Sequence, residues 1–552
     1  MKSFLLIIQL SFIISVSLSG QTQDIVKTAG ITFLLHRENI GKIIFTSKSI
    51  PLEELKETDF LNTYILTNKS DLFITVFMNN SVTNYMHILA PDLSAAELVK
   101  IGNYQFNLIV DNRLIYSSNL LPGAPYPKIQ DTATIFSKPF IDNKSPFGLW
   151  SQSFWNRFMN NGGDSVLTEG NHLLRMEIRP YVQSRAGLKV GDLIASGTVN
   201  LKVNRKPDIN LAKIKLTPVN PYNGFKVSSE KYDKNLIKTL KANIDEGVFK
   251  KISSVVVIKN GKLLIEEYFN GETRYSLHDP RSAGKSFSST ITGIAISEGY
   301  LKNEDHTLKE FYNIKSYENY SAQKENVSIK DLLTMSSVFD GNDDDYNSPG
   351  NEENMYPTPD WVKFALDLPV DLIRPKGEWH YFTAGVVVLG DILNTTVPGG
   401  LEKYSNQKLF KPLGITHYKW QYTPQNVPNT AGGIRMNALD FAKYGQLYKN
   451  MGKWNSKQVV PEAWIRKTFM KYKSIPGRID EFYGYLFWNK SYIVNGKAYE
   501  TFYCAGNGGN KIYIFTDQPL VIVITATAYG AIYAHTQEDK MMTDYILPAV
   551  IR

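Results

Sequence analysis

Cysteine is almost absent from this chain, whose 552 residues contain a single one, Cys504. One thiol excludes intramolecular disulfides and any cysteine-rich metal site. The eight histidines show no paired spacing of the H-x-x-x-H kind, so a zinc hydrolase site has no candidate ligands. We therefore predict no metal and no cofactor, and we expect Cys504 to be a small, buried apolar side chain.

Long runs of lysine or arginine are also missing, although basic residues outnumber acidic ones by 61 to 53. A nucleic-acid-binding surface needs clustered positive charge, so nucleic acid is not an expected partner. Beyond residue 20 there is no further long apolar stretch, and no integral membrane segment is expected there. The expected partner is a small-molecule or peptide substrate, and the oligomeric state stays open.

The N-terminus has the pattern of a secretory signal peptide. Lys2 precedes an apolar stretch over residues 4–18, small residues follow at Ser19 and Gly20, and the chain turns polar at Gln21. The alternative is an uncleaved membrane anchor, although the stretch is short for a span. We predict a signal peptide over residues 1–20 and an exported protein, periplasmic or secreted.

Residues 21–205 have the pattern of a β-sandwich-like accessory domain. Asp111-Asn112 marks a hairpin between two apolar runs, and further extended segments follow. The expected strands are residues 106–110, 113–116, 172–182 and 195–204. Long helical periodicity is scarce and no catalytic cluster appears, so an all-β sandwich with an unidentified ligand is expected.

A polar, proline-containing stretch over residues 206–233 is predicted to be a linker to a second domain over residues 234–552. Asn260-Gly261 is a strong hairpin signal between apolar runs. A long helix is expected from Ser282 to about Glu298, closed by Gly299, and strands are expected over residues 511–515 and 520–526. Strands at both ends with helices between them predict an α/β domain whose sheet is completed by distant segments.

Ser282-Ala-Gly-Lys285 is an S-x-x-K motif. On a helix, residues three apart share a face, so the lysine amine can reach the serine hydroxyl and accept its proton. Burial and the helix dipole both disfavour the ammonium form of such a lysine, as a base requires. The sequence contains four matches to this motif, and the other three begin at Ser228, Ser321 and Ser405 among charged and polar neighbours. Ser282 alone opens a helix rich in small and β-branched residues, although a helix cap would account for it equally well in isolation.

Further segments in the same order resemble the serine β-lactamase-related hydrolases, a superfamily of penicillin-binding-protein-like enzymes. It includes class C β-lactamases, D-peptidases, esterases and 6-aminohexanoate-dimer hydrolases. The matching segments are residues 281–286, 293–299, 327–336, 375–377, 381–390, 432–435, 440–464, 483–488 and 506–510. The resemblance covers about residues 235–552. It implies a β-lactamase/transpeptidase-like domain, an antiparallel sheet flanked by helices.

The resemblance assigns Tyr381 as the second catalytic residue and the backbone N–H groups of Ser282 and Asn510 as an oxyanion hole. The glycines in Gly506-Asn-Gly-Gly-Asn510 let a strand backbone approach a substrate closely. Substrate-binding positions would be Thr383, Asn507, Gly508 and Gly509. Thr383 replaces the usual Asn, and Asn507 stands where Lys or His is usual. Losing that cation weakens the case for an acidic substrate and disfavours an ordinary β-lactamase.

The acidic loop over residues 340–353 lies between the first two motifs, and it is either solvated, attractive to a cationic substrate, or able to hold Ca²⁺. We expect an esterase or amidase that forms an acyl-enzyme at Ser282 with Lys285 as base. One alternative is a D-stereospecific peptidase, transpeptidase or β-lactamase acting on cell-wall-type substrates. Another is an inactive binding or sensor protein.

Overall fold

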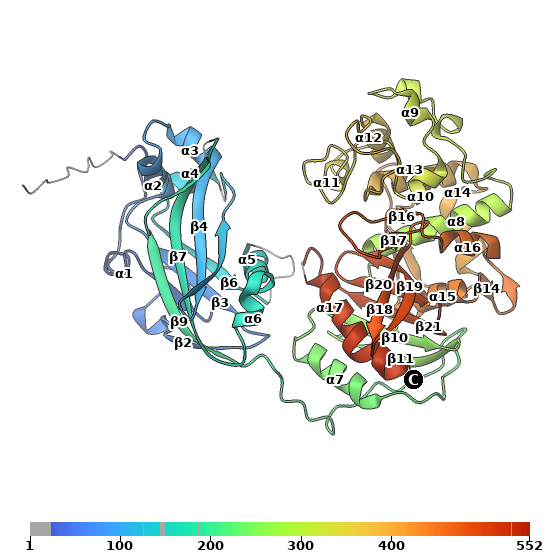
Figure 1. Cartoon of the computed structure of the whole chain (residues 1–552), viewed down its shortest axis with the longest axis horizontal. Helices are drawn as coiled ribbons and strands as arrows, with labels where there is room; N and C mark the ends of the chain where they lie inside the picture. The colour runs from blue at the N-terminus through green and yellow to red at the C-terminus, as the bar shows by residue number, and fades with distance from the viewer. Residues whose placement is uncertain (1–23, 125, 144–149, 186, 532, 552) are drawn as a thin grey trace, which may run out of the picture. The chain divides into compact units, whose positions relative to one another are not determined.

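The computed structural model describes residues 24–124, 126–143, 150–185, 187–531 and 533–551. The chain divides at Arg205 and Lys206 into two compact units, each built around its own sheets (Figure 1). The predicted signal peptide, residues 1–20, lies outside the described residues.

The first unit is rich in sheet, as the sequence predicts. Its larger sheet has the order β2 (Thr63–Leu66), β9 (Ala195–Val203), β7 (Gly170–Ser184), β4 (Gly102–Val110), β5 (Arg113–Asn119), with β8 (Gly187–Val190) on β7. Its smaller sheet has the order β1 (Ile43–Thr46), β3 (Leu72–Phe77), β6 (Ile135–Ile141). Asp111 and Asn112 adopt φ angles of 50° and 63° and form the predicted hairpin between β4 and β5.

Short helices complete the core of the first unit, and sequence periodicity did not indicate them. They are α1 (Leu34–Glu38), α2 (Val82–Leu89), α3 (Ala95–Ile101), α4 (Pro127–Thr132), α5 (Trp150–Phe158) and α6 (Asp164–Val166). Ile74 of β3, Leu108 of β4 and Met176 of β7 share one buried cluster with Met86 of α2 and Phe158 of α5. Both sheets and the helices therefore bury a common apolar core.

The second unit contains an eight-stranded antiparallel sheet, as the family resemblance implies. Its order is β11 (Lys262–Tyr268), β10 (Ile252–Lys259), β21 (Leu520–Ala526), β20 (Asn510–Phe515), β19 (Lys497–Gly506), β18 (Trp488–Val494), β17 (Phe482–Tyr483), β16 (Lys473–Ser474). Strand β10 pairs with β21, so segments about 260 residues apart close the sheet, as expected. Asn260 and Gly261, with φ angles of 50° and 70°, turn the β10–β11 hairpin.

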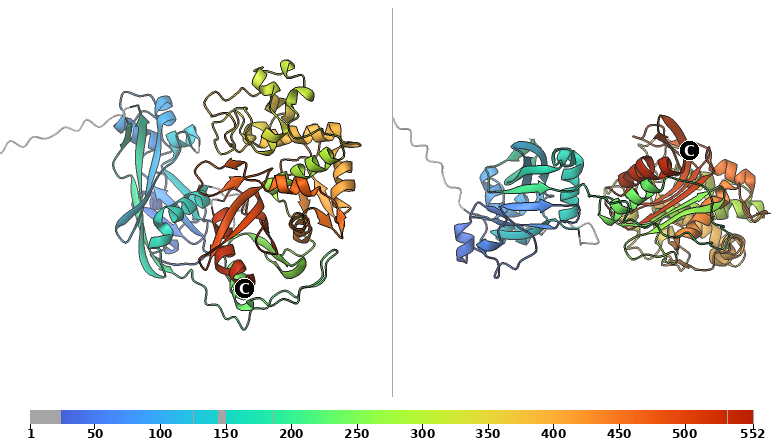
Figure 2. Two further views of the ribbon diagram at one scale, coloured as in Figure 1. Left: turned by 45° about the vertical axis from the view of Figure 1, so that its right-hand side comes forward. Right: turned by 90° about the horizontal axis from the view of Figure 1, so that it is seen from below.

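Alternating side chains give this sheet two buried faces. In β20, Ile512 and Ile514 join the core that contains α8, α13 and α15, whereas Tyr513 and Phe515 join the core beneath α7, α17 and α18. These helices are α7 (Lys234–Asp245), α8 (Lys285–Ser297), α13 (Thr383–Thr396), α15 (Ala438–Lys449), α17 (Ala534–Met541) and α18 (Leu547–Val550). In the right-hand view of Figure 2, helices lie on either side of this sheet.

Smaller elements surround these layers. The helices are α9 (Ala322–Glu325), α10 (Ile329–Leu333), α11 (Glu352–Met355), α12 (Trp361–Asp367), α14 (Gly400–Ser405) and α16 (Glu462–Thr468). The two-stranded ribbons pair β12 (Tyr418–Trp420) with β13 (Ile434–Met436) and β14 (Lys453–Trp454) with β15 (Lys457–Gln458). Within the described chain no single helix is long and apolar enough to cross a membrane. One bent pair of helices, Thr383–Thr396 with Gly400–Phe410, has sufficient length and apolar composition, and these are the only two properties considered.

Residues 206–233 differ from the expected linker, because they cluster with the second unit. The Ser228 N–H donates to the carbonyl of Leu263 in β11 at 2.8 Å, and Phe225 is 3% exposed within the core. The segment is polar and contains proline, but at Lys226 and Ser228 its backbone is hydrogen-bonded to the edge strand β11. It therefore forms part of the folded unit.

Candidate active site

Ser282 and Lys285 lie at the start of the long central helix of the second unit. A 3₁₀ turn over Arg281–Gly284 precedes α8, so the helix begins at Lys285 and not, as predicted, at Ser282. The eclipsed i, i+3 geometry of that turn aligns the two side chains. Lys285 Nζ donates to Ser282 Oγ at 2.7 Å, and Lys285 is 2% exposed.

Small residues let α8 pack closely on all sides. Every residue from Lys285 to Ala295 is buried. A Cβ added to Gly293 would lie 2.3 Å from the Trp464 ring, so only glycine fits there. Several buried hydroxyls of α8 have partners: Thr290 Oγ1, for example, lies 2.7 Å from Tyr444 Oη. The helix is therefore deeply buried, and its packing fixes the position of the turn that carries Ser282.

The other three S-x-x-K matches do not reproduce this contact. Lys324, three residues after Ser321, donates to the carbonyls of Glu318 and Asn319 at 2.9 and 3.1 Å. Lys408, three residues after Ser405, pairs with Glu298 at 2.5 Å. Among the described residues, only Ser282–Lys285 shows a hydrogen bond between the motif's serine and lysine.

Tyr381 lies beside the pair, just before α13 begins at Thr383. Lys285 Nζ is 5.0 Å from the centre of the Tyr381 ring. Burial raises the pKa of the Tyr381 phenol, while the Lys285 charge and a hydrogen bond with Ser282 act in the opposite direction. Trp488 stacks on the ring at 5.8 Å and holds it in place. The three residues predicted to be catalytic are thus brought together.

The glycine-containing loop, which joins the central strands β19 and β20, approaches the turn that carries Ser282. Gly506 ends β19 and pairs with Asn510, which begins β20. A Cβ added to Gly506 would lie 1.8 Å from the carbonyl oxygen of Pro280 and 2.9 Å from the nitrogen of Ala283. Glycine is therefore required for this strand to reach the backbone around Ser282.

The predicted substrate-binding residues have varied surroundings. Asn507 Oδ1 accepts a hydrogen bond from the Gly530 N–H at 2.8 Å, so its side chain is tied to a neighbouring loop. Gly508 and Gly509 have φ angles of 84° and 95°, which side-chain-bearing residues rarely adopt. Thr383 is fully buried, and its hydroxyl has no hydrogen-bond partner among the described residues.

The Asn510 side chain braces this loop. Its Nδ2 donates to the carbonyls of Asn507 and Ala526, each at 3.0 Å, and its Oδ1 accepts from the Ala526 N–H at 3.2 Å. The side chain is therefore occupied within the protein. The predicted oxyanion hole uses the backbone N–H of Asn510, and these side-chain bonds hold that backbone in place.

Asp343, which the sequence placed only within a generally acidic loop, contacts the site directly. Its carboxylate accepts from the Thr383 N–H at 2.7 Å and the Glu352 N–H at 2.8 Å. Burial and the nearby Glu352 raise the pKa of Asp343 to about 6, against the opposing charge of Lys285. The loop is therefore docked at the site, although no local motif marks Asp343. Among the described residues, no group of three or more His, Cys, Asp or Glu could hold a metal ion.

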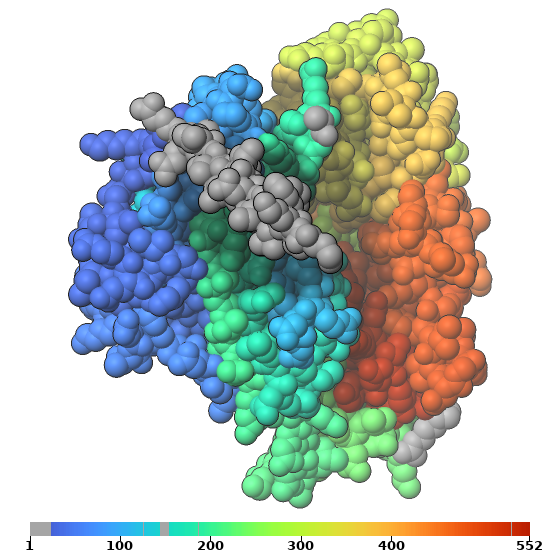
Figure 3. All heavy atoms as spheres, turned by 60° about the vertical axis from the view of Figure 1, so that its left-hand side comes forward, coloured from blue at the N-terminus to red at the C-terminus, as the bar shows by residue number. Residues whose placement is uncertain are grey.

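The hairpin between β16 and β17 forms another border of the site. The Arg478 guanidinium lies 5.0 Å from the centre of the Trp488 ring, and Trp488 in turn stacks on Tyr381. In the space-filling view, orange atoms from the part of the chain before residue 500 lie against both yellow atoms and red atoms of the C-terminal part (Figure 3). Segments remote in sequence therefore surround Tyr381.

The fold of the second unit is that of a β-lactamase/transpeptidase-like domain. The family model described as beta-lactamase matches residues 240–539, more than half of the chain. The chain therefore belongs to the beta-lactamase family.

Individual relatives are distant. "Protein flp" of Staphylococcus aureus is 25% identical over 195 residues, which cover 33% of this chain and 38% of that protein. The chain thus spans less than half the length of the curated relatives it matches. A penicillin binding protein from Bacillus halodurans has 15% identity and a TM-score of 0.44, covering 56% of this chain and 99% of its own. EstCE1, "a hydrolase with promiscuous acyltransferase activity", has 14% identity and a TM-score of 0.45, covering 56% and 96%.

Proposed function

We propose that this protein is a serine hydrolase that cleaves an ester or amide bond through an acyl-enzyme at Ser282. The observation that carries the proposal is the 2.7 Å contact between Ser282 Oγ and the buried Lys285 Nζ, with Tyr381 adjoining both. This distance suits proton transfer in either direction between hydroxyl and amine. Ser282 Oγ attacks the carbonyl carbon while its proton passes to Lys285.

Tyr381 and the glycine-containing loop complete the proposed chemistry. The Tyr381 hydroxyl relays the proton to the leaving group. The bond between the carbonyl carbon and this group then breaks, and the acyl group stays bonded to Ser282 Oγ. The backbone N–H groups of Ser282 and Asn510 stabilise the tetrahedral oxyanion, a contribution typically worth about 3–4 kcal/mol per donor. Water then attacks the acyl-enzyme, and the acid product and free Ser282 are released.

A fluorophosphonate probe tests this proposal. The intact protein is treated with the probe, and the adduct is located by mass spectrometry of peptides. We expect labelling at Ser282, none in Ser282→Ala, and unchanged labelling in Ser321→Ala. Ser321 is the matched control because it begins another S-x-x-K motif whose lysine faces backbone carbonyls. A folded protein that takes no label would favour an inactive binding or sensor role, and a label on another serine would refute the site.

A peptidase acting on D-peptides is the second candidate, favoured by an arginine that packs on the loop to which the Asn507 side chain is bonded. The Arg281 guanidinium lies 4.4 Å from the centre of the Tyr529 ring, and the following Gly530 donates to Asn507. An arginine there can bind a peptide carboxylate in place of the missing lysine. Hydrolysis of a D-alanyl-D-alanine peptide faster than its C-terminal amide, with the preference lost in Arg281→Gln, would support the peptidase. Equal rates would leave the esterase or amidase.

The same proposal places the enzyme outside the cytoplasm, on the basis of the predicted signal peptide at residues 1–20. N-terminal sequencing of the protein recovered from its native cells tests this. A mature chain that begins near Gln21 in the periplasmic or culture fraction is the expected result. An intact Met1 in a membrane fraction would indicate the anchor alternative.

A further inference from the structure

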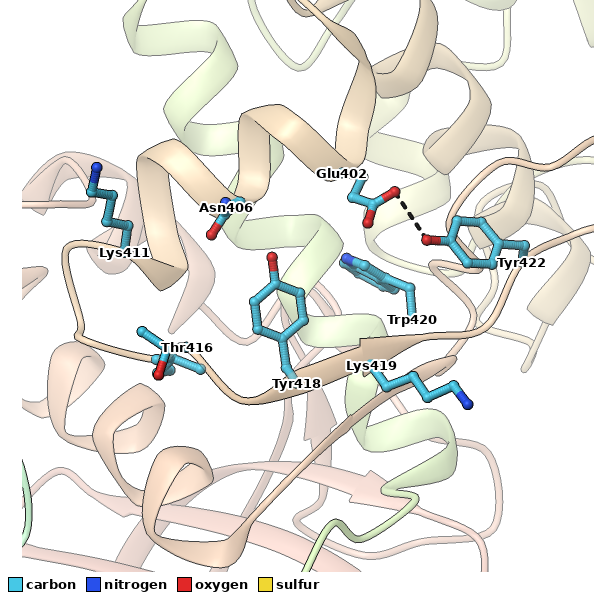
Figure 4. Close-up of a pocket in the computed structure, with 9 residues that line it drawn as sticks. Glu402, Asn406, Lys411, Thr416, Tyr418, Lys419, Trp420 and Tyr422 are labelled. Atoms are coloured by element: carbon cyan, nitrogen blue, oxygen red, sulfur yellow. Dashed lines mark hydrogen bonds between the residues drawn. The ribbon is translucent and has the colours of Figure 1, made fainter.

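A pocket of about 610 Å³ lies on the second unit between α14, the turn that follows it, and strand β12. Figure 4 shows its side chains. Glu402 and Asn406 project from the helical side, and Tyr418, Trp420 and Tyr422 project from the strand side. None of the residues that form the candidate active site lines this pocket, so it is a separate site.

The strand side presents an aromatic platform. Tyr418, Trp420 and Tyr422 alternate along an extended segment, and alternate residues of a strand share one face. Phe410 packs behind the platform, with its ring 4.5 Å from Tyr418 and 6.2 Å from Trp420. Phe410 thus holds the Tyr418 and Trp420 rings in place, and the segment lines one side of the pocket with aromatic rings.

Polar groups surround the platform with hydrogen-bonding capacity to spare. Trp420 is 7% exposed, and its indole N–H has no acceptor among the described residues. The Tyr422 hydroxyl donates to Glu402 Oε2 at 2.9 Å, which leaves the other carboxylate oxygen available as an acceptor. Figure 4 shows the Tyr418 hydroxyl and the Asn406 amide pointing toward each other across the pocket.

These groups select among ligand classes. A cationic ligand is disfavoured, because Lys411 and Lys419 line the same pocket and an unpaired indole N–H requires an acceptor. A purely apolar ligand would leave that donor and the Glu402 carboxylate unsatisfied. A sugar ring fits, since it has a C–H face that packs on an aromatic ring and a hydroxyl edge that both donates and accepts.

We propose that this pocket binds an oligosaccharide, with separate sugar rings stacked on Tyr418 and on Tyr422 and their hydroxyls bonded to Glu402 and Asn406. The neighbouring Gln421 faces the opposite way, and its side chain donates to Asp279 at 3.4 Å, three residues before Ser282. The carbohydrate site therefore lies on the other side of a segment that borders the nucleophile turn. The proposal does not depend on whether Ser282 is reactive.

Calorimetric titration of the full chain tests it, in the Ser282→Ala background so that hydrolysis cannot contribute heat. The probes are the tetrasaccharides of β-1,4-linked N-acetylglucosamine, β-1,4-linked glucose and α-1,4-linked glucose, with tetramethylammonium as the cationic comparison. We expect at least one tetrasaccharide to bind with a dissociation constant of about 1 mM or tighter, and no binding of tetramethylammonium. Removing the ring in Tyr422→Ala should weaken binding about tenfold.

Tyr320→Ala is the matched control, because Tyr320 is 47% exposed, as against 43% for Tyr422, and its hydroxyl also donates to a glutamate. It should leave saccharide affinity unchanged. Trp420→Phe keeps an aromatic ring but removes the N–H, and should weaken binding about fivefold. Three results would overturn the proposal: binding of none of the saccharides by the folded protein, binding of tetramethylammonium alone, or saccharide affinity equal in Tyr422→Ala and Tyr320→Ala.

Discussion

Two buried lysine–carboxylate pairs in the second unit have opposite surroundings. In α15, Lys443 Nζ lies 2.9 Å from Asp440, and both side chains are 3% exposed or less. Asn437 donates to the Asp440 carboxylate at 2.9 Å, and Lys443 also donates to the Gly414 carbonyl. Between β20 and α17, Lys511 Nζ lies 3.9 Å from Glu538, whose two carboxylate oxygens are buried without a hydrogen-bond partner among the described residues.

The difference lies in how each pair offsets its loss of hydration. Buried charges are tolerated when further hydrogen bonds complete them, as around Asp440. Among the described residues, the Glu538 carboxylate has no such hydrogen bonds. Burial raises the pKa of this carboxyl to about 8, against the attraction of the Lys511 charge. This carboxyl lies directly beneath the candidate site, because a Cβ added to Gly509 would be 2.3 Å from Glu538 Oε1. The well-satisfied pair supports a helix, whereas the poorly satisfied one supports the glycine-containing loop.

The largest loss of stability is expected when the Lys443–Asp440 pair is broken. Asp440→Asn keeps the side-chain shape but leaves the buried Lys443 ammonium without its counter-charge. We expect the free energy of unfolding to fall by about 3–5 kcal/mol, as is typical when one partner of a buried pair is removed. Urea unfolding followed by circular dichroism measures it. A loss below about 1 kcal/mol would show that the hydrogen bonds, and not the opposite charges, hold this pair.

Local signals predicted much of the sheet and the central helix. Asn260-Gly261 has the left-handed backbone that its residue types favour, and the strand found at Leu520–Ala526 is the one the apolar run predicted. The helices of the first unit were missed because they are short. Such helices depend on tertiary packing, as Met86 of α2 does in the common core, and leave little periodicity to detect.

The same limit applies to the site. Three-residue spacing brings Ser282 and Lys285 together, and that contact was predictable from sequence. Asp343 reaches the Thr383 N–H across 40 residues, and Glu538 reaches Gly509 from a different element. Contacts of this kind arise from topology, so the residue types alone did not single out either carboxylate.

A change in stability of intermediate size, dependent on pH, is expected from the Lys511–Glu538 pair. The unfolded Glu538 carboxyl releases its proton near pH 4.3, whereas the folded one retains it up to a pKa of about 8. The folded state therefore binds more protons between these values, and its stability falls as pH rises from about 4.5 to 8. Glu538→Gln mimics the protonated acid and removes this decline. We expect the variant to match the native protein at pH 5 and to exceed its unfolding free energy by on the order of 1–3 kcal/mol at pH 8.

Urea titrations of both proteins at pH 5 and pH 8 provide the measurement. Lys511 requires a separate check, because burial lowers the pKa of its ammonium to about 8 and its contribution begins only above that pH. Lys511→Met should therefore leave the decline between pH 5 and 7 in place. If Glu538→Gln retains the decline of the native protein, Glu538 is ionised in the fold, and the contrast with Asp440 fails.

The smallest change in unfolding free energy is expected for an ion pair that stays exposed to solvent in the folded protein. Arg466 Nη2 lies 2.6 Å from Glu462, closer than either buried pair, yet their side chains are 68% and 44% exposed. Both charges remain hydrated and screened, so Glu462→Gln should change the unfolding free energy by less than about 0.5 kcal/mol, and less again in 1 M salt. A loss as large as that of Asp440→Asn would mean that proximity alone ranks these pairs. The expected near-neutral result would instead show that the loss of hydration on burial, and not the distance between the charges, determines how much each ion pair affects the unfolding free energy.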